Sequence, residues 1–97
     1  GMGEALMEEI LYDDKGNVIN TNLAEYKIPT SLDMPELDSI IIETNEPNGP
    51  YGAKEVGEGA IMPTIPAILN AIYNATGVRV TELPATPERI AMMVREG

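Results

Sequence analysis

The residues with the clearest capacity for chemistry lie in a glycine-rich stretch near the middle of the chain. Residues 49–59 read Gly-Pro-Tyr-Gly-Ala-Lys-Glu-Val-Gly-Glu-Gly and hold four of the nine glycines. Glu58 stands between Gly57 and Gly59, so neither neighbour shields it and both give the backbone freedom to aim it. A carboxylate placed in this way suits general-base chemistry if it faces its proton donor in a dry pocket. The alternative interpretation is a mobile surface loop with ordinary solvated charges.

The stretch is also part of an ordered series of motifs. Residues 52–58 (GAKEVGE) resemble the G-x-K-x-V-G-E segment near the C-terminus of the molybdenum-binding subunit of molybdenum hydroxylases, the xanthine dehydrogenase and aldehyde oxidase family. The match extends in the family's order over four further segments: residues 1–9 (GMGEALMEE), 26–35 (YKIPTSLDMP), 66–72 (PAILNAI) and 84–90 (PATPERI). Together the motifs cover nearly the whole chain. They correspond to the final part of a subunit that is several times longer.

The resemblance implies roles for individual residues of the loop. Glu58 matches the glutamate that serves as the family's general base, which takes a proton from a hydroxyl group on the metal. Lys54, Val56 and Gly57 are candidates for contact with the cofactor, a molybdenum held by a pyranopterin. We expect that cofactor in the assembled enzyme alone, with no metal ligand from this chain and no cofactor on the isolated chain. The implied partners are the remaining part of the molybdenum-binding subunit and the iron–sulfur and flavin subunits or domains.

Two side chains of the loop have alternative interpretations. Lys54 either approaches the cofactor or pairs with a loop acid such as Glu55. Glu55 stands where the family usually has a small residue, so its carboxylate either crowds the site or points to solvent.

The composition excludes several classes of function. The chain has 97 residues, 16 acids against 6 bases, and a formal net charge of −10. Such acidity argues against a nucleic-acid or anionic membrane partner, because both need clustered Lys and Arg. With neither cysteine nor histidine, the chain offers no thiolate nucleophile, iron–sulfur ligand or usual zinc site. No apolar run approaches a membrane span and no export leader is evident, so we expect a cytoplasmic protein. We interpret Gly1 before Met2 as a remnant of tag removal.

The first half of the chain carries the strand signals. Residues 3–10 predict a short helix. Residues 10–19 predict a β-hairpin, because apolar runs flank the turn signal of residues 13–17. We interpret its aspartates as turn residues, since the further spaced oxygens of a calcium loop are missing. Ile40-Ile41-Ile42 predicts a strand with two apolar faces that both need cover, which a chain this small cannot easily supply. Possible self-association follows from that exposed surface.

The second half carries the helix signals. Apolar residues recur at helical spacing from about Pro63 to Ala75, and Gly77 is the expected C-cap. Val78-Arg79-Val80 suggests a further short strand, and Thr86-Pro87-Glu88 predicts the start of a last helix. Early strands and late helices together predict one α+β domain over residues 1–97. We expect a small mixed domain with a β-hairpin, a short sheet and about three helices.

Two functional hypotheses from different classes remain. The first is the C-terminal, cofactor-proximal piece of a molybdenum hydroxylase, which contributes Glu58 and is inactive alone because it is too short. The second is a non-catalytic acidic interaction module left from a split or broken gene. A reductive relative, similar to 4-hydroxybenzoyl-CoA reductase, is equally compatible with these residues, because substrate choice lies in parts that the motifs do not include.

Overall fold

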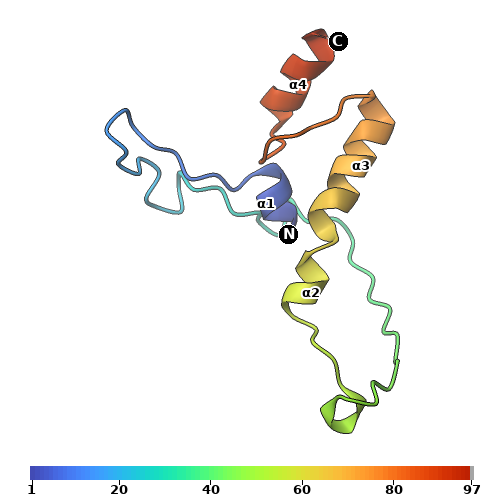
Figure 1. Cartoon of the computed structure of the whole chain (residues 1–97). Coiled ribbons are helices and arrows are strands. Elements are labelled where there is room, and N and C mark those ends of the chain that lie inside the picture. Colours follow the sequence, from blue (N-terminus) through green and yellow to red (C-terminus); the bar gives the residue numbers. More distant parts are fainter. Residues whose placement is uncertain (97) are drawn as a thin grey trace.

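A computed structural model describes residues 1–96, and it is built from short helices joined by long irregular segments (Figure 1). Three of the helices are α1 (Met2–Leu6), α3 (Thr64–Thr76) and α4 (Pro87–Glu96). The sequence did not predict the two others, which are the single 3₁₀ turn η1 (Pro50–Gly52) and the short helix α2 (Glu58–Ile61).

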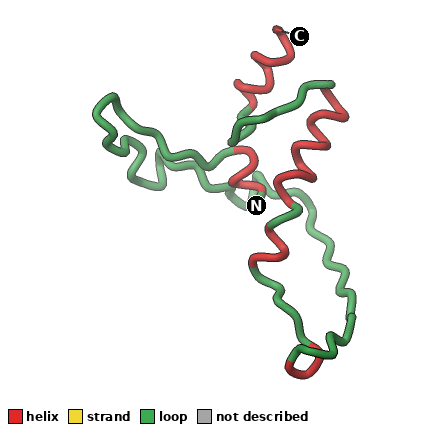
Figure 2. Tube along the Cα trace, in the orientation of Figure 1, coloured by secondary structure: helices red, strands yellow, loops and turns green. Residues whose placement is uncertain are grey.

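The predicted α+β fold is wrong, because residues 1–96 form no sheet (Figure 2). The predicted β-hairpin is reduced to one isolated antiparallel bridge between Tyr12 and Val18. Its turn forms as expected, because the Asp13 carboxylate accepts hydrogen bonds from the backbone N–H groups of Lys15 and Asn17. A lone two-stranded ribbon is marginal in water, since it has no third strand or packed helix to support it.

The predicted strands at Ile40-Ile41-Ile42 and Val78-Arg79-Val80 are wrong for the same reason. Within the described residues no segment lies alongside either of them as a pairing partner. The three isoleucines are more than 80% exposed, on an irregular segment that runs from the α1 region to the far tip of the molecule (Figure 1). β-Branched residues favour strands because they pack well on a half-buried, pleated sheet, and residues 1–96 form no such sheet.

The late helices are confirmed, because their signals are local. α3 ends at Gly77, whose φ of 75° is in the left-handed region and whose N–H donates to the Tyr73 carbonyl. Glycine takes that conformation without a steric penalty, so it is the usual residue at this position. α4 begins as predicted after Thr86, whose Oγ1 accepts a hydrogen bond from the Arg89 N–H at 3.3 Å.

The elements meet at a small junction around α1. α1 packs against α3, and the Ala85 N–H donates to the Ala5 carbonyl at 2.6 Å. The buried hydrophobic side chains of the described chain are those of Ala5, Val80 and Ala85. All three are small, so this junction supplies little hydrophobic stabilisation.

Polar contacts tie two further segments to the junction. The buried Asn20 side chain accepts a hydrogen bond from the Leu11 N–H and donates one to the Glu9 carbonyl, which closes the base of the loop of residues 10–20. Arg89 forms an ion pair with Glu9 at 2.6 Å and donates to the Pro84 carbonyl at 2.8 Å. These contacts hold the start of α4 against the segment that follows α1.

The molecule is far more open than a globular domain of its size. Its accessible surface is 8088 Å², whereas about 5,400 Å² is typical of a folded monomer of this mass. Its radius of gyration is 17.5 Å, against about 13 Å for a typical domain of this length. Two arms extend from the junction in Figure 1, one formed by residues 10–27 and the other by residues 34–57. The chain therefore exposes a large surface that a compact domain of its size would bury.

No helix within residues 1–96 is both long and apolar enough to cross a bilayer.

Candidate functional site

The candidate site occupies the second arm, whose tip is a hydrogen-bonded turn. The Glu46 N–H donates to the Gly52 carbonyl at 3.1 Å, and the Ala53 N–H donates to the Pro50 carbonyl at 3.0 Å. Gly52 has a φ of 77°, which glycine adopts freely. Tyr51 has a φ of 54°, a conformation uncommon for a residue with a large side chain. The tip is thus defined by its own backbone, although it projects away from the junction.

Glu58 is the first residue of α2, and Gly57 is the N-cap. Its side chain is exposed, as are those of residues 53–62 generally. The carboxylate therefore has no protein wall around it within the described chain. A general base needs a dry pocket, and the described residues do not enclose Glu58 in one.

The Glu55 side chain is exposed, and its carboxylate makes a contact that the sequence did not predict. Its Oε2 accepts a hydrogen bond from the Gly59 N–H at 2.8 Å, so the carboxylate turns back onto the first turn of α2. A Cβ added at Gly59 would collide with this carboxylate. Glu55 thus satisfies a backbone donor at the helix start that would otherwise face water. The sequence signal was Glu55, two residues before Gly57-Glu58-Gly59. It predicts this hydrogen bond only once α2 is known to begin at Glu58.

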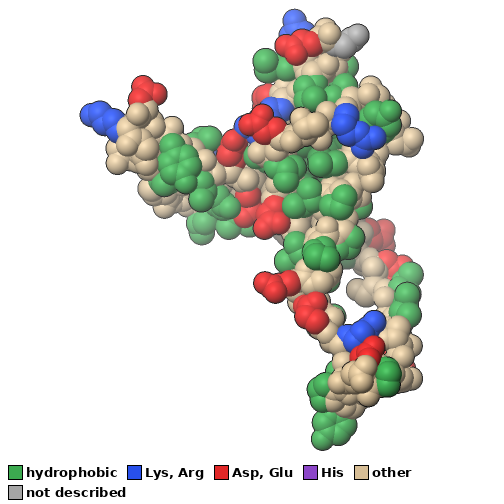
Figure 3. All heavy atoms as spheres, viewed as in Figure 1, with side chains coloured by type: hydrophobic (Ala, Val, Ile, Leu, Met, Phe, Trp, Pro, Cys, Tyr) green, Lys and Arg blue, Asp and Glu red, His purple; other side chains and the backbone are tan. Residues whose placement is uncertain are grey.

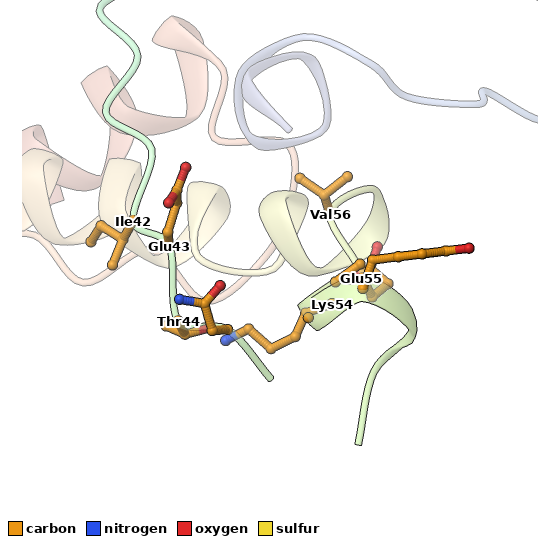
Figure 4. Close-up of a pocket in the computed structure, with 10 residues that line it drawn as sticks. Ile42, Glu43, Thr44, Lys54, Glu55 and Val56 are labelled. Atoms are coloured by element: carbon orange, nitrogen blue, oxygen red, sulfur yellow. The ribbon is translucent and has the colours of Figure 1, made fainter. Parts of the chain in front are cut away.

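Lys54 and Val56 line an open groove of about 410 Å³ between the two limbs of the arm (Figure 4). Lys54 extends toward Thr44 on the facing limb, while Glu55 points away from it (Figure 4). Among residues 1–96 the one ion pair is that of Arg89 with Glu9, so the alternative pairing of Lys54 with Glu55 does not form. Gly57 and Glu58 do not line this groove. The structure therefore places Lys54 and Val56 together and Glu58 just beyond them. The residues that line the groove are Ile42, Glu43, Thr44, Asn45, Tyr51, Gly52, Ala53, Lys54, Glu55 and Val56.

The carboxylates of the described chain do not form a metal site. No group of three or more acids is close enough to hold an ion within residues 1–96. The acids with a shifted pKa lie in turns away from the arm: hydrogen bonds from Asn17 lower the pKa of Asp13, and hydrogen bonds from Thr30 lower that of Asp33.

Comparison with known proteins finds similarity to molybdenum-binding subunits of larger enzymes. A family model described as a molybdopterin cofactor-binding domain matches residues 1–35. The chain is 48% identical over 91 residues to the xanthine dehydrogenase molybdenum-binding subunit of Escherichia coli O157:H7. It is 41% identical over 92 residues to the aldehyde oxidoreductase molybdenum-binding subunit PaoC of Escherichia coli K12. It is also 41% identical over 93 residues to the gamma subunit of the 6-hydroxypseudooxynicotine dehydrogenase complex of Paenarthrobacter nicotinovorans.

These matches confirm the resemblance to the molybdenum-binding subunits of the xanthine dehydrogenase and aldehyde oxidase family. Each alignment covers 93% of this chain, so it includes nearly all of the motifs. The same alignments cover 12%, 13% and 12% of the three relatives. The chain thus corresponds in sequence to a short part of such a subunit.

Proposed function

We propose that this chain is the C-terminal, cofactor-proximal piece of a molybdenum hydroxylase and contributes the general base Glu58. The observation that supports this most strongly is 48% identity across 93% of the chain to a molybdenum-binding subunit. Glu58 matches the glutamate of the family's G-x-K-x-V-G-E segment, and its carboxylate is exposed and free to meet a surface from outside.

The loop would present three residues to the cofactor and one to the reaction. Lys54 and Val56 line the groove, Gly57 brings the backbone close without a side chain, and Glu58 follows at the start of α2. The molybdenum–pyranopterin, when bound by the assembled subunit, supplies the oxidising centre. Glu58 accepts a proton from the group that attacks the substrate carbon, which strengthens that group as a nucleophile.

The chain is inactive by itself under this proposal, because it is too short and too open to form the whole site. Glu58 has no enclosing wall, and the accessible surface of 8088 Å² exceeds that of a compact domain of this mass by about half. That partner is the remaining part of the molybdenum-binding subunit. Electrons then leave through iron–sulfur and flavin subunits or domains. A relative named as part of a dehydrogenase complex supports such an assembly.

The competing proposal is a non-catalytic acidic interaction module. The net charge of −10 and the openness of the fold are compatible with it. It differs from the first in a single testable respect, which is whether the Glu58 carboxylate is needed for turnover.

The test uses a chimeric subunit in which residues 1–97 replace the matched segment of the Escherichia coli xanthine dehydrogenase molybdenum-binding subunit. Glu58→Gln keeps the shape of the side chain but cannot accept a proton at neutral pH. We expect it to lower turnover by roughly 10²–10⁴-fold with unchanged molybdenum content and helicity. Glu55→Gln is the matched control, three residues away on the same loop, and should lose much less. Equal losses, or no loss in either variant, would reject the catalytic role and favour the interaction module.

A further inference from the structure

We propose that Tyr51 is a docking anchor that seats the arm of residues 34–57 in an apolar pocket on the body of the molybdenum-binding subunit. This inference rests on the proposed function and deepens it. It names the residue and the chemistry by which the loop that carries Glu58 is held in place.

Tyr51 is the most exposed of the exposed large hydrophobic side chains, with a relative exposure of 107%. Two of the other tyrosines have partners in the chain: the Tyr26 hydroxyl donates to Glu8 at 2.9 Å, and the Arg79 guanidinium lies 3.8 Å from the centre of the Tyr73 ring. Tyr51 is one of the exposed residues on the tip of the second arm, where Figure 3 shows hydrophobic side chains among backbone and other residues. An aromatic ring held this far from its own chain has its full apolar area available for a partner, and tyrosine is enriched among the residues that dominate interface energies.

The backbone at the tip is fixed before docking. The tip turn is closed by the hydrogen bonds from Glu46 to Gly52 and from Ala53 to Pro50. Tyr51 nevertheless has a φ of 54°, which costs free energy for a residue with a Cβ. Conformations of this kind persist where the surroundings fix them, and they cluster at ligand clamps and functional sites. A loop whose backbone is fixed in advance loses less conformational entropy on binding.

Apolar residues next to Tyr51 extend the same surface. Ile42 and Val56 line the groove beside it from the two limbs of the arm, and both are more than 80% exposed. Charged side chains of Glu43, Lys54 and Glu55 line the same groove, so the apolar residues are bordered by polar ones, as the core of an interface is bordered by its rim.

The occupant is the subunit body rather than a second copy of the chain. The relatives are about eight times longer than their matched segment, because the matches cover only 12–13% of them. The surface lacking from this chain is therefore large. Tyr51 precedes Glu58 on one continuous loop, so the body that receives Glu58 also meets Tyr51. A net charge of −10 on each copy opposes the pairing of two copies.

The test uses the chimeric subunit described above and measures the rate of cleavage after Glu55 by a glutamate-specific protease under native conditions. In the parent chimera the docked arm should resist cleavage. Tyr51→Phe keeps the ring and should cleave at the parent rate. Tyr51→Asn removes the ring but tolerates the left-handed backbone, and should cleave at least about 30-fold faster, as expected for the loss of a hot-spot residue. Tyr12→Asn, on the other arm, is the matched control and should change the rate less than twofold.

A second measurement places the ring directly. A photo-crosslinking phenylalanine analogue at position 51 should join to apolar residues of the same subunit's body, as mapped by mass spectrometry. Crosslinks to a second copy would overturn the proposal, and so would a protected arm that Tyr51→Asn leaves protected. If that happens while Glu58→Gln still abolishes turnover, the anchor fails and the proposed function stands. A parent chimera with neither protection nor turnover overturns both.

Discussion

The Glu55 carboxylate accepts a hydrogen bond at 2.8 Å from the backbone N–H of Gly59, and so bridges over Glu58 between them. The three residues form a short unit in which one acid fixes the helix start and the other acid is left free. The two glutamates of the loop therefore differ in their contacts, although they lie three positions apart and are both exposed. The Glu55 carboxylate is bound to the start of α2 in this arrangement, and Glu58 is the residue that we propose for chemistry.

The first prediction follows from this hydrogen bond. Glu55→Ala should speed amide hydrogen exchange at Gly59 about fivefold, because the bond contributes on the order of 1 kcal/mol. Glu55→Gln retains an oxygen acceptor and should change the rate little. Exchange measured by NMR on the full chain reports the result. Gly59→Ala, which places a Cβ against the carboxylate, should behave as Glu55→Ala does, and an unchanged rate in both variants would contradict the bridge.

The turn of residues 13–17 should loosen in acid. Hydrogen bonds from Asn17 are the main cause that lowers the pKa of Asp13 below its ordinary 3.8. Because the folded pKa is the lower one, the ionised carboxylate stabilises the turn above pH 3.8, and the contribution disappears as the pH falls through the folded value. An NMR titration of the Asp13 carboxyl carbon should show a midpoint below 3.8. Asn17→Ala should raise that midpoint, and a midpoint unaffected by the change would refute the assignment.

The ion pair between Arg89 and Glu9 should hold the first turn of α4 to the junction. The two side chains are 33% and 32% exposed, so solvent screens the pair only in part. Arg89→Met should speed amide exchange in the first turn of α4 about fivefold, equivalent to roughly 1 kcal/mol. Arg95→Met removes the same charge from the last turn of the helix and is the control. The difference between the parent and Arg89→Met should shrink in 0.5 M salt, and a difference that persists unchanged would argue against the ion pair.

Limited proteolysis of the isolated chain should cut the irregular part of the second arm first. Glu36 and Glu43 lie in irregular, exposed backbone, whereas Glu4 and Glu88 lie in α1 and α4. A glutamate-specific protease should therefore cleave after residues 36 and 43 at least about tenfold faster than after residues 4 and 88, because cleavage requires local unfolding. Mass spectrometry of early fragments gives the order of cleavage, and initial cuts within the helices would contradict the structure.

The sequence was most informative where the structure depends on neighbouring residues alone. Gly77 at the end of α3 and Thr86 before α4 were predicted from helix-capping chemistry, and both make the expected hydrogen bonds. The strand at residues 40–42 was wrong because a strand exists only through pairing, and the pattern of three β-branched residues says nothing about what lies beside them. The hairpin was wrong in part for the same reason, since its turn forms and its strands do not.

The candidate site, too, was predicted only in part from the sequence. The sequence motif identified Glu58, Lys54, Val56 and Gly57 as candidate site residues. In the structure, Lys54 and Val56 line one groove. The hydrogen bond of Glu55 was not foreseen, because α2 begins between two glycines, which disfavour helices. The exposure of Tyr51 was not foreseen either, since it depends on a tip that projects from the rest of the chain.

The buried hydrophobic side chains of the described chain belong to two alanines and one valine. So small a buried core affects the stability of the isolated chain. With so small a junction, the isolated chain has little stability of its own, and under the proposed assembly its arms would become ordered on contact with a larger surface. Folding and assembly then become one event. A copy that finds no partner keeps its isoleucines and its loop tip exposed to chaperones and proteases. Under the proposed assembly, copies that have not joined a subunit body would be the ones open to degradation.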